Sequence, residues 1–121
     1  MKHETDLRLF GADSTIFDDI RLWAQERGLY DSGDVKTQMV KLTEEFGELG
    51  RAIIKNNNDL FADSVGDMII VLTNLVHLKH IELVGNDLLD EGLTIEDCIL
   101  KAWDEIKNRT GKMVDGTFVK D

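Results

Sequence analysis

The chain has 121 residues, of which 42% are hydrophobic and 31% are charged, and its net charge is −10 at pH 7. This length predicts one domain, residues 1–121, and the composition excludes a disordered acidic tail because enough apolar residues are present for a core. The single cysteine, Cys98, excludes an internal disulfide, and an acidic chain without a basic stripe is a poor partner for a nucleic-acid polymer.

The first predicted helix covers about residues 14–27, because Ser14 is a suitable N-cap and Gly28 a suitable stop. The second covers about residues 34–55, with Asp34 or Ser32 as its N-cap. Its apolar residues recur every three or four positions, which is typical of a helix that buries one face. This apolar stripe consists of Val35, Met39, Leu42, Phe46, Leu49 and Ile53.

The third predicted helix covers about residues 60–84, after an asparagine-rich turn, and stops near Gly85. It is unusually apolar, so we expect it at the centre of the fold or in an oligomer interface. Its most apolar stretch, residues 65–78, contains polar residues and is too short to span a bilayer, so we expect no membrane association. The polar N-terminus is unlike a signal peptide, and a cytoplasmic location follows.

The fourth predicted helix begins at Thr94, whose capping-box partner is Asp97, and ends near Thr110 and Gly111. Residues 86–93 are either a loop or a short helical turn. From about residue 112 we expect a short, non-helical tail with an extended segment. Four helices with short connections predict an all-α, antiparallel four-helix bundle.

The second helix carries an acidic face. At 100° per residue, Glu44, Glu45 and Glu48 lie on one side of the helix, with Lys41 and Gln38 one and two turns earlier along its edge. Acidic helix faces are most often simply solvated, so this pattern alone does not establish a site.

The third helix carries a polar stripe opposite its apolar side, formed by Asp63, Asp67, Asn74 and His77. Short polar residues in an apolar helix are typical of a lined pocket. Antiparallel packing against the preceding helix would place the two aspartates near the acidic face.

Converging carboxylates require a cation, because two unit charges about 5 Å apart repel by roughly 3 kcal/mol at an effective dielectric of 20. All-oxygen ligands select Mg²⁺ or Mn²⁺, and two such ions can bridge a polyphosphate and activate water. A di-iron bundle would require Glu-x-x-His pairs, which the sequence lacks. His77 and His80 have the spacing of a zinc pair, but no third ligand accompanies them.

The sequence Lys41-Leu42-x-Glu44-Glu45-x-Gly47-Glu48-Leu49, followed by Gly66-Asp67 in an apolar helix, resembles the MazG-like nucleoside triphosphate pyrophosphohydrolases. These belong to the all-α NTP pyrophosphatase superfamily, and the resemblance covers about residues 23–84. It implies a four-helix, oligomeric fold and Mg²⁺-dependent hydrolysis of a (d)NTP to the monophosphate and pyrophosphate. A homodimer or homotetramer is expected.

The family signature is E-E-x-x-E followed by E-x-x-D, and it implies Glu45, Glu48 and Asp67 as metal ligands. Glu44 matches the glutamate that orients or deprotonates water. The chain departs from the signature at position 64, where Ser64 replaces a glutamate. We expect Asp63, one turn before Asp67, to supply the missing carboxylate.

The other candidate residues would contact the substrate. A basic group near the end of the chain either holds phosphate oxygens or compensates a helix C-terminus; it consists of Lys101, Lys107, Arg109 and Lys112. Asn74 is expected to contact sugar or base, because a buried amide needs hydrogen-bond partners. Trp23 either stacks on a base or belongs to the core, and the core is favoured by its periodicity.

The favoured function is hydrolysis of a nucleoside triphosphate between the α and β phosphates, with Mg²⁺ as the cofactor. One alternative is a related enzyme that cleaves another pyrophosphate compound, such as phosphoribosyl-ATP or an alarmone. The other is a non-enzymatic helical oligomerisation module.

Overall fold

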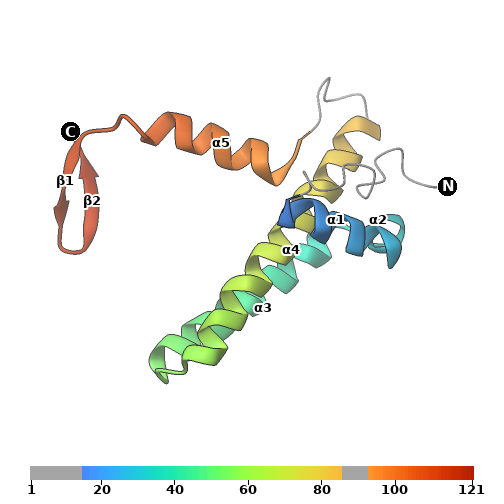
Figure 1. Ribbon diagram of the computed structural model, residues 1–121, viewed down its shortest axis with the longest axis horizontal. Helices are drawn as coiled ribbons and strands as arrows, with labels where there is room; N and C mark the ends of the chain where they lie inside the picture. Colours follow the sequence, from blue (N-terminus) through green and yellow to red (C-terminus); the bar gives the residue numbers. More distant parts are fainter. Residues whose placement is uncertain (1–14, 86–92) are drawn as a thin grey trace.

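The computed structural model describes residues 15–85 and 93–121 (Figure 1). The helices are α1 (Ile16–Glu26), α2 (Leu29–Ser32), α3 (Val35–Ile54), α4 (Asn58–Gly85) and α5 (Ile95–Ile106). A two-stranded antiparallel sheet follows, with β1 (Gly111–Val114) and β2 (Thr117–Lys120). The fold is mostly helical, as predicted, with a small β-hairpin added.

Side-chain caps begin four of the described helices, including α4, where the Asn57 side chain accepts the Leu60 N–H. Thr15 caps α1 in a capping box with Asp18, and Thr94 caps α5 in a capping box with Asp97, as predicted for the latter. Asp34 accepts the Thr37 N–H at the start of α3, which confirms this boundary. The predicted cap Ser14 lies outside the described residues. α2 was not predicted.

Helices α3 and α4 form a long antiparallel hairpin, and α1 packs across α4 (Figure 1). Few hydrophobic residues are buried in the described chain: Ala24, Ala52, Val71, Val76, Leu78 and Ile95. α4 supplies half of these residues, Val71, Val76 and Leu78, so it lies at the centre of the chain's own core, which is one of the two places predicted for it.

A closed four-helix bundle is not formed within one chain, so that part of the prediction is wrong for the single copy. α5 projects away from the α3–α4 hairpin and carries β1 and β2 at its far end (Figure 1). Within α5 only Ile95 is buried. The helix ends at Ile106, a few residues earlier than predicted.

The β-hairpin turns at Asp115 and Gly116, whose φ angles are 50° and 80°. Positive φ at both central residues is the geometry of the two-residue turn that suits twisted antiparallel strands, and Asp-Gly is a favoured sequence for it. The strands pair Met113 with Phe118 and Val114 with Thr117. This segment confirms the predicted extended tail.

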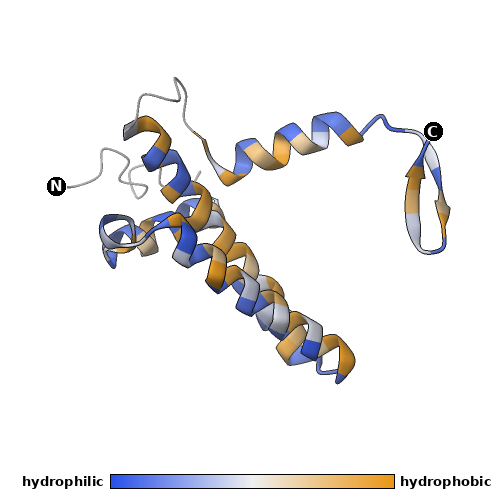
Figure 2. Cartoon of the chain, turned by 180° about the vertical axis from the view of Figure 1, so that it is seen from behind, coloured by the Kyte–Doolittle hydropathy of each residue, from blue (hydrophilic) through white to orange (hydrophobic). Residues whose placement is uncertain are grey.

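Only part of the apolar stripe of α3 is covered. Met39, Phe46 and Ile53 are 52%, 64% and 59% exposed, whereas the other stripe residues, Val35, Leu42 and Leu49, are half-buried. Ala52 is buried and only 13% of the Glu45 side chain is exposed, so the inward side of α3 lies between the apolar stripe and the acidic face. Figure 2 shows hydrophobic residues along α4 and on α5 and the strands.

α4 is long and apolar enough, by length and composition alone, to cross a membrane. The helix runs for 28 residues, whereas the expectation of no membrane association rests on its most apolar stretch, residues 65–78, and stays a prediction. The same criteria are also met by core helices of soluble proteins. The buried Ser64, Thr73 and Asn74 on α4 pack within the protein.

Candidate functional site

A pocket of about 460 Å³ lies between α1, the start of α2, α3 and α4. Six of its lining residues were predicted from the sequence: Gln38, Lys41, Glu44, Glu45, Asp67 and Asn74. Trp23, Leu29, Thr37, Val40, Ile70 and Val71 complete the lining. The pocket therefore has a carboxylate-bearing wall and an apolar wall.

The carboxylates reach the pocket from two helices. Glu45 lies on the inward side of α3, and its Oε1 is 3.5 Å from the Nζ of Lys41 one turn earlier. Asp67 comes from α4 and also lines an adjoining hollow that contains Asp19 and Trp23. The predicted convergence of the acidic face of α3 with the polar stripe of α4 is present for these residues.

Glu48 and Asp63 do not line the pocket as it stands. Glu48 is ion-paired with Arg51, one turn later on α3. Asp63 is exposed, whereas the neighbouring Ser64 is only 2% exposed and faces inward. The position at which the signature expects a glutamate is therefore the one that faces the interior of the hairpin.

A metal site is not assembled in this arrangement. Within residues 15–85 and 93–121, no three His, Cys, Asp or Glu side chains are close enough together to hold one ion. The donor set of the pocket nevertheless fits a hard cation in kind, because its acidic groups all offer oxygen atoms.

Asn74 lies at the inner end of the pocket and is only 3% exposed. The Tyr30 hydroxyl donates a hydrogen bond of 2.7 Å to its Oδ1. Burial raises the pKa of Tyr30, so this hydroxyl keeps its proton and remains a donor. The Tyr30 ring also packs on His77, with 4.2 Å between the ring centroids.

Trp23 belongs to the pocket rather than to the core, so the favoured interpretation of this residue is wrong. It is 48% exposed, and the Arg27 guanidinium carbon lies 4.5 Å from the centre of its ring. Sequence reasoning missed Tyr30 and Leu29 because the short helix α2 was not expected. Tyr30 is the chain's single tyrosine, which was the available signal.

The predicted basic group lies elsewhere in the single chain. Lys101 is on α5, Lys107 caps its C-terminus and is ion-paired with Asp104, and Lys112 is on β1. Arg109 lies between the helix and the strand. None of these four residues lines the pocket of its own chain.

A buried arginine ties α1 to the base of α5. Arg21 donates hydrogen bonds of 2.7 and 2.6 Å to the two carboxylate oxygens of Glu96 and one of 2.8 Å to Asp18. The hydrogen bonds from Arg21 hold the pKa of Glu96 below its usual value, against the opposing effect of burial. His80 adds a contact by accepting the Leu93 N–H at Nδ1, so it is not the surface residue that its isolation suggested.

The comparisons with known proteins leave the function open. The chain is similar to an uncharacterized 18.2 kDa protein from the rep–hol intergenic region of Haemophilus phage HP1 (strain HP1c1), at 38% identity over 69 residues. The match covers 57% of this chain and 42% of the relative, so the matched part is less than half of the relative's length. No protein-family model matches the chain, and no solved structure matches it.

Proposed function

We propose that this chain is a Mg²⁺-dependent nucleoside triphosphate pyrophosphohydrolase, related to the MazG-like enzymes that its Glu-Glu-x-x-Glu motif resembles. The observation that carries the proposal is the pocket lined by Glu44 and Glu45 of α3 and by Asp67 of α4, together with Trp23 and Asn74. Its volume of about 460 Å³ lies in the range typical of small-molecule sites. The pocket thus offers anionic oxygen donors and an aromatic ring within one cavity.

The carboxylates divide the chemistry between them. Glu45 and Asp67 would hold Mg²⁺, and Glu48 would join them on release from Arg51. Asp63, one turn before Asp67 on α4, is proposed as a further Mg²⁺ ligand. Bound Mg²⁺, or Mn²⁺, would neutralise the triphosphate and make water more acidic. Glu44 would align the attacking water and accept its proton.

The apolar end of the pocket would take the nucleoside. Trp23 offers a half-exposed ring on which a base can stack. Because the oxygen of Asn74 is engaged by Tyr30, its amide N–H groups are the donors it can offer to a base or sugar oxygen. Gln38 and Lys41 lie along the same wall and would contact phosphate or sugar oxygens.

Phosphate charge would be neutralised in part by another subunit. The basic residues Lys101, Lys107, Arg109 and Lys112 lie outside the pocket of their own chain, so their predicted role requires a homodimer or homotetramer. Basic side chains hold phosphate oxygens through charge-assisted hydrogen bonds.

Two alternative functions remain compatible with features of the structure. An enzyme that cleaves another pyrophosphate compound would use the same carboxylates and differ only at the apolar end. A non-enzymatic oligomerisation module is favoured by the exposed part of the apolar stripe of α3, formed by Met39, Phe46 and Ile53.

The test is product analysis. Each common (d)NTP is incubated with the purified chain and MgCl₂, without added pyrophosphatase, and the products are separated and identified by ³¹P NMR. We expect equal amounts of monophosphate and pyrophosphate. Orthophosphate with a diphosphate would overturn the α–β assignment, and no turnover of any (d)NTP would favour one of the alternatives.

Variants assign the activity to the pocket. Glu45→Gln and Asp67→Asn should each reduce kcat by about 100-fold or more, because each removes charge from the proposed metal site. Glu105→Gln on exposed α5 is the matched control and should leave kcat unchanged. Equal activity of Glu45→Gln and the control would place the reaction elsewhere.

A further inference from the structure

The α3–α4 hairpin has an apolar side that its own chain leaves open. On α3, Met39, Phe46 and Ile53 are more than half exposed, and on α4, Phe61 and Val65 are 44% and 41% exposed. A groove of about 200 Å³ joins the two helices there, between Met39, Leu42, Thr43, Phe46 and Met68. We call this surface the outer face; Phe46 at its centre lies about 100° around α3 from Glu45.

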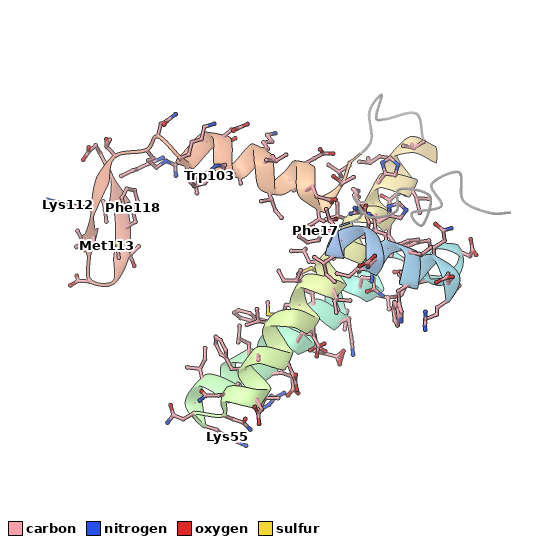
Figure 3. All side chains as sticks on the ribbon, in the orientation of Figure 1. Phe17, Lys55, Trp103, Lys112, Met113 and Phe118 are labelled. Carbon is pink, nitrogen blue, oxygen red and sulfur yellow. The ribbon has the colours of Figure 1, made fainter. Side chains whose placement is uncertain are left out.

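The segment formed by α5, β1 and β2, here called the arm, is also uncovered. Ile99, Trp103 and Ile106 recur along one side of α5 and are 49%, 53% and 46% exposed. On the β-hairpin, Met113 and Phe118 form a cross-strand pair and are 64% and 48% exposed. Figure 3 shows Trp103, Met113 and Phe118 along the arm, with no other described part of the chain beside them.

The arm cannot be stable without a surface to pack on. Isolated helices shorter than about 12–15 residues are marginal in water, and so is a single two-stranded hairpin. α5 has 12 residues, and its single buried residue is Ile95 at the base. The arm therefore needs contacts beyond those of its own chain.

Contacts at the base of the arm fix its direction relative to α1. Glu96 accepts two hydrogen bonds from the buried Arg21, and Thr94 and Asp97 form the capping box that starts α5. Folding the arm back onto the outer face of its own chain would break the Arg21–Glu96 pair. A second copy meets no such obstacle.

Surface area favours a second copy as the occupant. The chain exposes 8909 Å², about 2,300 Å² more than a compact monomer of its mass. If the residues outside the described ranges accounted for half of this excess, the rest would still exceed the roughly 800 Å² that a standard interface takes from each partner. Charge does not oppose the contact, because residues 95–120 carry five basic and five acidic side chains.

We propose that two copies exchange arms, so that the arm of each copy packs across the outer face of the other. Trp103 and Phe118 supply the large aromatic anchors, and the groove beside Phe46 receives one of them. A two-fold axis satisfies both arms and both outer faces at once. This inference extends the homo-oligomer of the proposed function but does not depend on nucleotide hydrolysis.

The first measurement is the mass in solution, by size-exclusion chromatography with light scattering from 1 to 100 µM. The unsubstituted chain should be a dimer or a larger even-numbered assembly. Phe46→Glu on the outer face and Trp103→Glu on the arm should each raise the dimer Kd by at least about 30-fold. Ile16→Glu is the matched control, because Ile16 is 66% exposed on α1, outside both the arm and the outer face.

The second measurement uses the unsubstituted chain, so that it does not depend on the folding of any variant. Equal amounts of ¹⁵N-labelled and unlabelled protein are mixed, unfolded, refolded together and treated with a carbodiimide that joins lysines to nearby carboxylates. Mixed-isotope cross-links between residues 95–120 and residues 35–72 support arm exchange. A monomer at 100 µM, arm cross-links confined to single chains, or a dimer equally sensitive to Ile16→Glu would each overturn it.

Discussion

The hydrogen bond from Tyr30 to Asn74 should stabilise both the fold and the inner end of the pocket, and Tyr30→Phe tests this. The substitution removes only the hydroxyl and keeps the ring that packs on His77. It leaves the Asn74 oxygen without its 2.7 Å donor at a residue that is 3% exposed. An unsatisfied buried polar group costs about 1–3 kcal/mol, so we expect the free energy of unfolding to fall by that amount.

A double-mutant cycle separates this bond from general packing effects. Asn74→Leu removes the acceptor and leaves the Tyr30 hydroxyl buried, whereas the combined variant places two apolar groups together. We expect the combined loss to be smaller than the sum of the single losses by about 1 kcal/mol or more. Urea unfolding of all four proteins, at one concentration well above the dimer Kd, provides the values.

Additive losses, within about 0.5 kcal/mol, would refute the reasoning, because residues that share a bond must couple. If the pocket binds a nucleoside through Asn74, Tyr30→Phe should also raise KM by about fivefold, since roughly 1 kcal/mol of orientation is lost. The kcat should change less than KM, because the carboxylates are untouched.

Three further predictions concern charged residues. Glu96→Gln should lower the free energy of unfolding by about 1–3 kcal/mol at pH 7 through loss of the Arg21 pair. Because the pKa of Glu96 is depressed in the folded state, the pair stabilises the protein above the ordinary glutamate pKa of 4.5, and this stabilisation is lost as the pH falls. Urea unfolding at pH 3 should therefore show a smaller difference in stability between the variant and the unsubstituted protein. Asp63→Asn should raise the Mg²⁺ concentration needed for half-maximal rate, whereas Ser64→Ala should not; an unchanged Mg²⁺ dependence in Asp63→Asn would defeat the idea that Asp63 replaces the missing glutamate. Glu48→Gln should change metal-free stability by no more than about 0.5 kcal/mol, because its pair with Arg51 is exposed, yet should abolish the rise in Tm caused by Mg²⁺; a large loss of metal-free stability would make Glu48 a structural residue.

Local signals in the sequence were enough to predict the long helices. The bounds of α3 agree with prediction because Asp34 caps it through its own side chain, and the start of α5 agrees because Thr94 and Asp97 form a capping box. These interactions join residues that are three positions apart, so they can be predicted from the spacing of residue types in the sequence. The Asp115–Gly116 turn is local in the same sense.

The shared pocket of Glu45, Asp67 and Asn74 was also within reach of the sequence. Helical periodicity places the polar groups of each helix on one side, and the short turn between α3 and α4 makes the helices antiparallel neighbours. The role of Tyr30 could not be predicted from the sequence, because Tyr30 lies 44 residues from Asn74 and belongs to a helix of only four residues.

Only the tertiary structure decided how much of the apolar stripe of α3 is covered. The stripe predicted burial, yet Met39, Phe46 and Ile53 are exposed, and the inward side of the helix also includes Glu45. Periodicity identifies a face that avoids water, but it does not say whether the covering surface belongs to the same chain or to another. The direction of α5 was equally hidden, because it depends on the pairing of Arg21 with Glu96 across 75 residues, and long-range contacts of this kind leave no periodic trace in a sequence.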